Sequence, residues 1–164
     1  MKSFRSTKGK ESLEVEKSIS KGRKHLEEMR DIDRFIKQLN MQIEQEESML
    51  MDISVHYKEI SVQTSGAKDL MSEKVPEIVE LQQSLKEYVK ELEQKKLVTL
   101  SILKKMKNRR RAQLLLLYFM QNKTLEQTAE AMDKSYTWTW EEMQEAITDF
   151  ERLFKKRRKE SSNG

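Results

Sequence analysis

The sequence predicts an all-α protein: a long antiparallel helical hairpin followed by a C-terminal helix-turn-helix. Two observations predict this class. First, apolar residues make up 36% of the chain and charged residues 37%, a balance that suits long helices burying one stripe each rather than a single compact globule. Second, only four Gly and one Pro interrupt a chain rich in Met, Leu, Glu, Lys and Gln, which favour helix by intrinsic preference. The β-branched and aromatic runs that are typical of strands are missing.

Two apolar stripes define the predicted hairpin, residues 18–107. Residues 1–17 are rich in Lys, Ser, Thr and Gly and predict a disordered basic arm. The first stripe, Leu26 to Ile60, advances by steps of three and four like a heptad seam. The second, Ile78 to Met106, follows a break at residues 63–74, and Pro76 suits a first helical turn. Neither helix can bury its stripe alone, so the two pair within one chain or in a homodimer.

Capping residues outline the predicted helix-turn-helix domain, residues 108–154. Asn108 can cap a helix over Arg109–Met120, which is either separate from the preceding helix or continuous with it. The string Thr124-Leu-Glu-Gln predicts a capping box at the start of a helix over residues 125–132. Ser135 can cap the last helix, which should run from Tyr136 to about Phe154. Residues 155–164 then form a basic tail.

Charge is distributed in blocks along the chain. The net charge is only +4, but residues 100–123 contain seven cations and no acid, and residues 155–164 contain five cations and one acid. Residues 124–154 between them contain eight acids and two cations. Concentrated basic clusters of this kind indicate a polyanionic partner.

Several functional classes are not expected. The chain has no Cys, so it has no disulfide or thiol chemistry, which is compatible with the cytoplasm. The longest apolar run, Leu114–Met120, is far shorter than the roughly 20 residues of a membrane span, and no apolar segment of a signal peptide follows the basic N-terminus. His25 and His56 are too far apart to indicate a metal site. With no nucleophile–base pair and no phosphate-binding Gly loop, we expect no enzyme activity and no cofactor.

A family resemblance starts from the string Thr124–Met132, followed by Ser135, Met143 and Ala146-Ile147. These residues resemble the C-terminal, region 4-like helix-turn-helix of bacterial sigma factors. Over about residues 26–154 the layout resembles small sigma-like regulators of phages and prophages, such as the ArpU and RinA type activators of late operons. The resemblance implies transcription regulation by binding double-stranded DNA near promoters, with RNA polymerase as a further partner.

Some positions depart from the family pattern. Thr128 and Lys134 stand where an aliphatic residue is usual, Thr139 where Val or Ile is usual, and Asp133 where the turn Gly is usual. These departures should weaken the small core and make it depend more on three aromatic residues, Tyr136, Trp138 and Trp140. We expect at least one of the two tryptophans to lie in that core.

The layout predicts the DNA contacts, because the second helix of the motif can enter a major groove. The residues expected to face bases are Ser135, Tyr136, Thr137, Trp140, Glu141 and Gln144. Gln can read adenine and Glu can accept from cytosine, but an acidic face repels phosphate, so affinity must come from two basic flanks. These are Lys104, Lys105, Lys107, Arg109, Arg110 and Arg111, and Lys155, Lys156, Arg157 and Arg158.

An alternative keeps the same fold with a different partner. The acidic residues of the expected recognition helix also suit a protein-interaction module. Such a module would bind RNA polymerase or another host protein without reading DNA. Salt-sensitive binding to DNA distinguishes the first function from this alternative.

Overall fold

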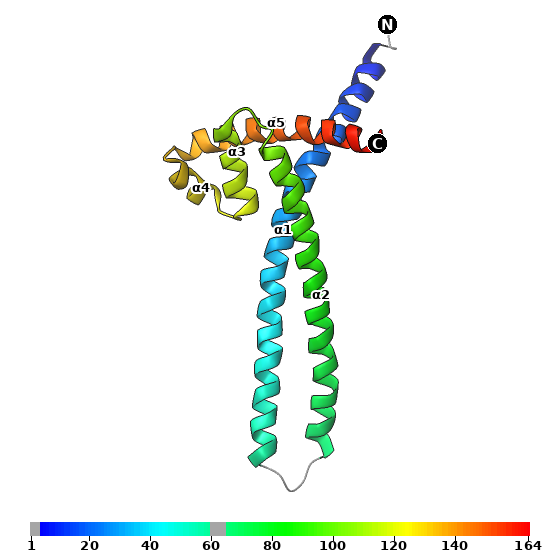
Figure 1. Ribbon diagram of the computed structural model, residues 1–164, viewed down its shortest axis with the longest axis vertical. Coiled ribbons are helices and arrows are strands. Elements are labelled where there is room, and N and C mark those ends of the chain that lie inside the picture. Colours follow the sequence, from blue (N-terminus) through cyan, green and yellow to red (C-terminus); the bar gives the residue numbers. More distant parts are fainter. Residues whose placement is uncertain (1–3, 60–64) are drawn as a thin grey trace. The chain divides into compact units, whose positions relative to one another are not determined.

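The computed structural model describes the backbone of residues 4–59 and 65–164, and the side chains of residues 21–56 and 70–164. In these ranges every regular element is helical (Figure 1), which confirms the all-α class. The chain divides into two compact units, residues 1–31 with 94–164 and residues 32–93. The elements are α1 (Phe4–Glu59), α2 (Ser65–Leu103), α3 (Arg109–Leu115), the π-helical turn η1 (Leu116–Met120), α4 (Leu125–Met132) and α5 (Tyr136–Ser162).

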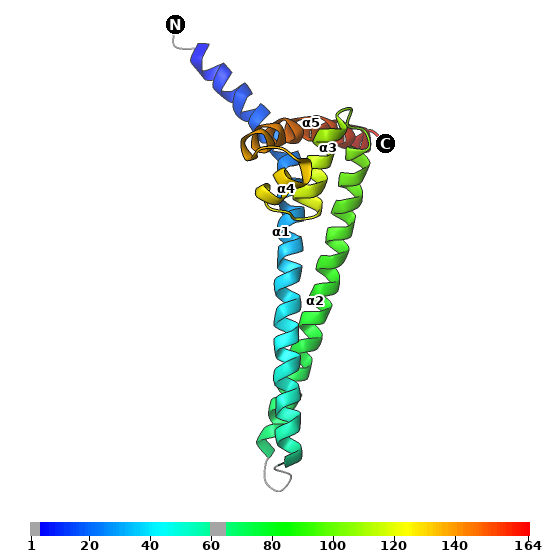
Figure 2. The same cartoon turned by 90° about the vertical axis from the view of Figure 1, so that its left-hand side faces the viewer.

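The unit of residues 32–93 is an antiparallel pair formed by α1 and α2, which run side by side in Figures 1 and 2. The ring centroids of Phe35 and Tyr88 lie 4.9 Å apart, and Lys74 Nζ lies 2.7 Å from a carboxylate oxygen of Glu46. The predicted stripes form the buried seam between these contacts. Its buried members are Ile36, Leu39, Ile43, Ile78 and Leu92.

Helix boundaries differ from the sequence-based predictions at two places. Residues 4–17, expected to be a disordered arm, belong to α1, and residues 65–74, expected to break the pattern, belong to α2. Extending an existing helix costs much less than nucleating one, so these polar segments continue the long helices beside them. Pro76 therefore lies inside α2 and not in a first turn. A proline in the interior of a helix removes one intrahelical hydrogen bond.

The core of the other unit lies where α1 up to residue 31 and α2 from residue 94 meet α3, α4 and α5. His25 of α1 contacts α2 and α5 together: its Nε2 lies 3.0 Å from the Thr99 hydroxyl, and its ring centroid lies 5.1 Å from that of Phe154. The Thr99 hydroxyl also lies 2.9 Å from the Lys95 carbonyl. Other fully buried side chains are Leu26, Met29, Ile102, Leu114, Leu115 and Phe150.

A glycine allows α1 and α5 to approach each other closely. A Cβ atom at Gly22 would lie 2.9 Å from Cγ and 3.0 Å from Cα of Glu151, so only a residue without a side chain fits without a shift. Glu151 is buried beneath this glycine. Its burial raises the pKa of the carboxyl group, opposed by the charge of Arg23 and by a hydrogen bond to the Arg23 backbone.

Protonation of His25 should destabilise the fold. Burial, with the nearby charge of Lys95, lowers the pKa of His25, while Glu28 acts in the opposite direction and Arg157 adds to the lowering. The unfolded chain therefore binds more protons below about pH 6.5, the ordinary pKa of histidine, and the free energy of unfolding should fall as pH drops through that value. Urea unfolding at a series of pH values measures the slope.

A matched pair of substitutions isolates this effect. His25→Leu replaces the titratable ring by an apolar side chain of similar size. The dependence of the free energy of unfolding on pH should therefore become flatter between about pH 7 and 5. The same change at the exposed His56 should leave the slope as it is in the unsubstituted chain. An unchanged slope in the His25 variant would contradict the prediction.

Candidate nucleic-acid interface

Helices α4 and α5 are joined by a short turn, and their N-terminal ends are capped as the sequence predicts. Thr124 accepts from the Gln127 backbone N–H at 3.1 Å and the Gln127 side chain accepts from the Thr124 backbone at 3.0 Å. Ser135 accepts from the Trp138 backbone N–H at 3.1 Å. Between them Asp133 adopts the left-handed conformation with φ of 53°, which Asp tolerates better than most residues. Both helices pack on α3, on η1 or on each other.

The helix Arg109–Met120 expected after Asn108 is separate from α2. Asn108 accepts from the backbone N–H groups of Arg110 and Arg111 at 3.1 and 3.2 Å, which starts α3 as a new helix. Its last turn widens into the π-helical turn η1. This start positions the arginines that follow Asn108 beside α5.

The two threonines that were expected to weaken the small core both lie inside it. Thr128 and Thr139 are fully buried, and each hydroxyl donates at 2.8 Å to the backbone carbonyl four residues earlier. This local bond satisfies the hydroxyl, so the methyl group can pack as an apolar surface. The core does not depend on Tyr136 or Trp140, which are 52% and 53% exposed, whereas Trp138 is half-buried.

The residues predicted to face bases mostly lie on the solvent side of the first turns of α5. Tyr136, Thr137, Trp140 and Glu141 are exposed, and Ser135 is exposed while it caps the helix. Gln144 is the exception.

Gln144 is half-buried, and its side-chain carbonyl accepts from Arg23 Nη2 of α1 at 3.2 Å. This internal bond competes with a base contact. Gln144 therefore differs from Tyr136, Thr137, Trp140 and Glu141, whose side chains are exposed.

Arg111, which was predicted to contact phosphate, is paired with two carboxylates of α5 in the structure. Its Nε lies 2.6 Å from Glu142 and its Nη1 lies 2.8 Å from Asp149, and all three side chains are only about one-quarter exposed. Hydrogen bonds to the two carboxylates raise the pKa of Arg111. Arg111 thus joins α3 to α5, while the other members of this flank are exposed: Lys104, Lys105, Lys107, Arg109 and Arg110.

The predicted basic tail is part of α5, which extends to Ser162. Lys and Arg favour helix and are stabilised near a helix C-terminus by the macrodipole, which accounts for the extension. Lys155, Lys156 and Arg158 are exposed, whereas Arg157 is half-buried on the side of His25, whose pKa it lowers.

Two cations flank Trp138 at the N-terminal end of α5. The Arg110 guanidinium carbon lies 5.9 Å and the Lys134 Nζ lies 5.5 Å from the indole centroid. From the sequence, Lys134 was predicted only to depart from a core pattern. Arg110 reaches Trp138 because α3 packs against α5.

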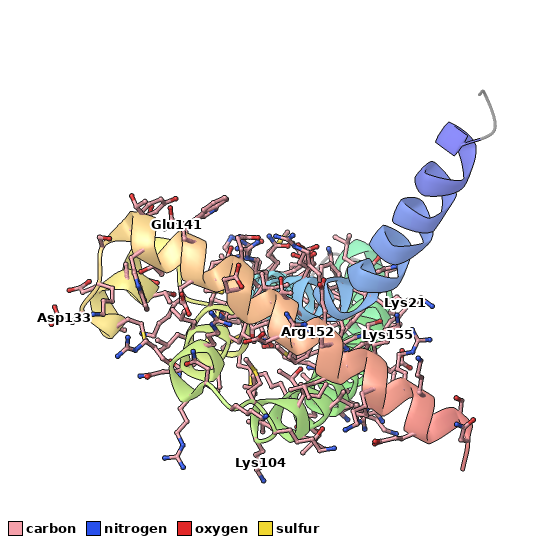
Figure 3. All side chains as sticks on the ribbon, turned by 90° about the horizontal axis from the view of Figure 1, so that it is seen from above. Lys21, Lys104, Asp133, Glu141, Arg152 and Lys155 are labelled. Carbon is pink, nitrogen blue, oxygen red and sulfur yellow. The ribbon has the colours of Figure 1, made fainter. Side chains whose placement is uncertain are left out.

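Exposed charged side chains lie along the whole of α5 (Figure 3). Glu141 and Asp133 lie near the N-terminal end of α5, whereas Lys21, Arg152 and Lys155 lie along its other half. Within the described residues no group of His, Cys, Asp or Glu could hold a metal ion. In the same residues no helix is both long and apolar enough to cross a membrane.

Comparisons with known proteins add no relatives. No protein-family model, curated protein or solved structure matches this chain. The geometry of the helix-turn-helix and the distribution of charge around it therefore carry the functional argument.

Proposed function

We propose that this chain is a transcription regulator of the phage and prophage type that binds double-stranded DNA through α4 and α5. The observation that carries the proposal is the N-terminal end of α5. There, exposed Tyr136, Thr137 and Trp140 follow a capped helix start, and two cations flank Trp138 within 6 Å. A helix N-terminus with nearby Arg and Lys suits the edge of a major groove, where phosphates border the bases.

The two cations would contact phosphates on either side of the groove. Arg110 comes from the start of α3 and Lys134 from the turn before α5, so they approach the Trp138 side chain from different segments. Phosphate contacts of this kind orient the protein and contribute affinity without reading sequence. Arg109, exposed on the first turn of α3, would extend the same contact surface.

Base reading by α5 should be weak. Glu141 and Glu145 are exposed acids on the helix that would enter the groove, and the side chain of Gln144 is engaged by Arg23. Glu can accept from cytosine N4 but cannot donate to any base, and each acid repels the phosphate backbone. Most of the affinity must therefore come from cations, and binding should fall steeply as salt rises.

Fluorescence anisotropy with short duplexes at several salt concentrations tests the proposal. Removing both flanking cations with Arg110→Gln and Lys134→Gln should flatten the dependence of log affinity on log salt by about 0.9 per lost phosphate contact, for all sequences alike. The matched control removes the same charge from exposed positions of α2, Lys86→Gln and Lys90→Gln, and should change the slope little. Binding that is absent, or independent of salt, would overturn the proposal.

The second candidate is a protein-interaction module that binds RNA polymerase or another host protein. It is favoured by Tyr136 and Trp140, each about half exposed, beside the exposed acid Glu141. Tyr and Trp are enriched among residues that dominate protein interfaces, and acids favour a basic partner. Capture of RNA polymerase after nuclease treatment, with no salt-dependent DNA binding, would replace the first candidate by this one.

A further inference from the structure

We propose that the crossing of α1 and α5 holds a second, separate binding site for a phosphate group. A hollow of about 280 Å³ lies there. It is far along α5 from the residues that the proposed function places at DNA. The residues that line it are Lys21, Phe154, Lys155, Arg158, Lys159 and Ser162.

The chemistry of the hollow suits a phosphate. Among the described residues that line it, every charged side chain is cationic, and Ser162 adds a hydroxyl. Four cations around one hollow repel one another, and a dianionic or polyanionic phosphate relieves that repulsion while accepting several charge-assisted hydrogen bonds. Arg offers a planar fork of donors and Lys a mobile point charge, a combination common where phosphate is bound.

Packing of aromatic rings holds α5 in place next to the hollow. Phe154 contacts the buried His25, with ring centroids 5.1 Å apart, and Phe150, with centroids 5.9 Å apart. These contacts fix α5 against α1 below the cations. Lys155, Arg158 and Lys159 follow within the next helical turn and a half of α5, so they project from a helix whose position is set by the core.

Close approach of the two helices brings Lys21 to the same place. Gly22 follows Lys21 and lies against the backbone of Glu151, so α1 crosses α5 one turn before Lys155. Figure 3 shows Lys21 beside Lys155 at this crossing. Two acids border these three cations in the sequence. Glu151 is covered by Gly22 and hydrogen-bonded toward the Arg23 backbone, and Glu160 is exposed but does not line the hollow.

The phosphate could belong to a nucleic acid backbone or to a free phosphate compound, and the recognising chemistry is the same. As a nucleic acid contact the site rests on the proposed function, because it would bind the duplex beyond the segment next to α4 and α5. As a free-phosphate site it stands without that function. The experiment therefore has one arm for each source.

The first arm titrates inorganic pyrophosphate into the full chain by calorimetry, with backbone amide shifts of residues 154–162 followed by NMR. Lys21→Gln and Lys159→Gln should each weaken binding by about fivefold, as expected for one cation close to a phosphate at a protein surface. The matched controls are Lys24→Gln on α1 and Arg152→Gln on α5, two exposed cations that do not line the hollow. Each control removes the same charge from the same helix.

Equal losses in hollow and control variants, or the absence of pyrophosphate binding, would overturn the site. Thermal melting by circular dichroism shows whether each variant remains folded, and all four replaced cations are exposed. A larger loss in the hollow variants than in their controls supports it.

The second arm repeats the comparison with a mixed-sequence duplex. A flattening of the salt slope by about 0.9 for each hollow lysine, and not for its control, assigns the phosphate to nucleic acid. Normal DNA binding by the hollow variants, together with weakened pyrophosphate binding, assigns it to a free phosphate compound. If the chain does not bind DNA at all, the proposed function fails while the pyrophosphate arm still decides the site.

Discussion

Replacing Phe150 by alanine should lower the free energy of unfolding by about 3–4 kcal/mol, the range for a large-to-small change in a packed core. Phe150 is fully buried. Its ring lies 6.3 Å from that of His25, in a stacked arrangement, and 5.9 Å from that of Phe154. The cavity would therefore open between α1 and α5, where α1 is held only by side-chain packing and a few polar contacts.

Urea unfolding followed by far-ultraviolet circular dichroism measures this loss. Leu97→Ala is the control, since Leu97 is 67% exposed on α2 and belongs to the same unit. We expect the control to change the free energy of unfolding by less than about 0.5 kcal/mol. A loss below about 1 kcal/mol in the Phe150 variant would mean that the ring is not part of a tightly packed core.

Replacing Arg111 by methionine should lower the free energy of unfolding by about 2 kcal/mol, because it leaves two partly buried carboxylates without their cation. Glu142 and Asp149 both accept from Arg111, at 2.6 and 2.8 Å, and are 23% and 25% exposed. The loss is set below that of a fully buried pair because water reaches all three groups. Arg109→Met, at an exposed position on the same helix, should be nearly neutral.

Neutralising the acids tests whether the loss comes from the unpaired carboxylates. Adding Glu142→Gln and Asp149→Asn to Arg111→Met should recover most of the stability. The DNA assay gives a second readout. A residue that contacts phosphate would flatten the salt slope without loss of stability, and that result for Arg111 would contradict the structural role assigned to it.

Local sequence signals predicted the elements of the C-terminal domain well. Asn108, Thr124 and Ser135 each cap a helix as expected, because a cap depends on side chain and backbone within a few residues. The buried face of α5 was also predictable from its spacing, and Thr139, Met143, Ala146, Ile147 and Phe150 are buried. Helix ends that lack a capping signal were predicted less well. Helix α1 begins earlier and α5 ends later than the sequence predicted.

The candidate interface depended on contacts that no local pattern encodes. In the sequence Arg111 is one of three consecutive arginines and was predicted to act like the other two. Only the packing of α3 on α5 reveals that it is paired with Glu142 and Asp149. Gln144 was expected to face bases and instead bonds Arg23, 121 residues away in sequence. Lys21 was not predicted to be a binding residue, because nothing near it in the sequence resembles a binding motif.

The sequence by itself determined that this chain is helical, where its C-terminal helices begin and where its charge is concentrated. These properties follow from propensity, capping and composition, which act over a few residues. Only the tertiary structure decided which cations are exposed to a partner and which are paired with acids of the same chain. The availability of a polar or charged side chain depends on what packs against it, and for Arg111, Gln144 and Lys21 the deciding neighbours come from other helices.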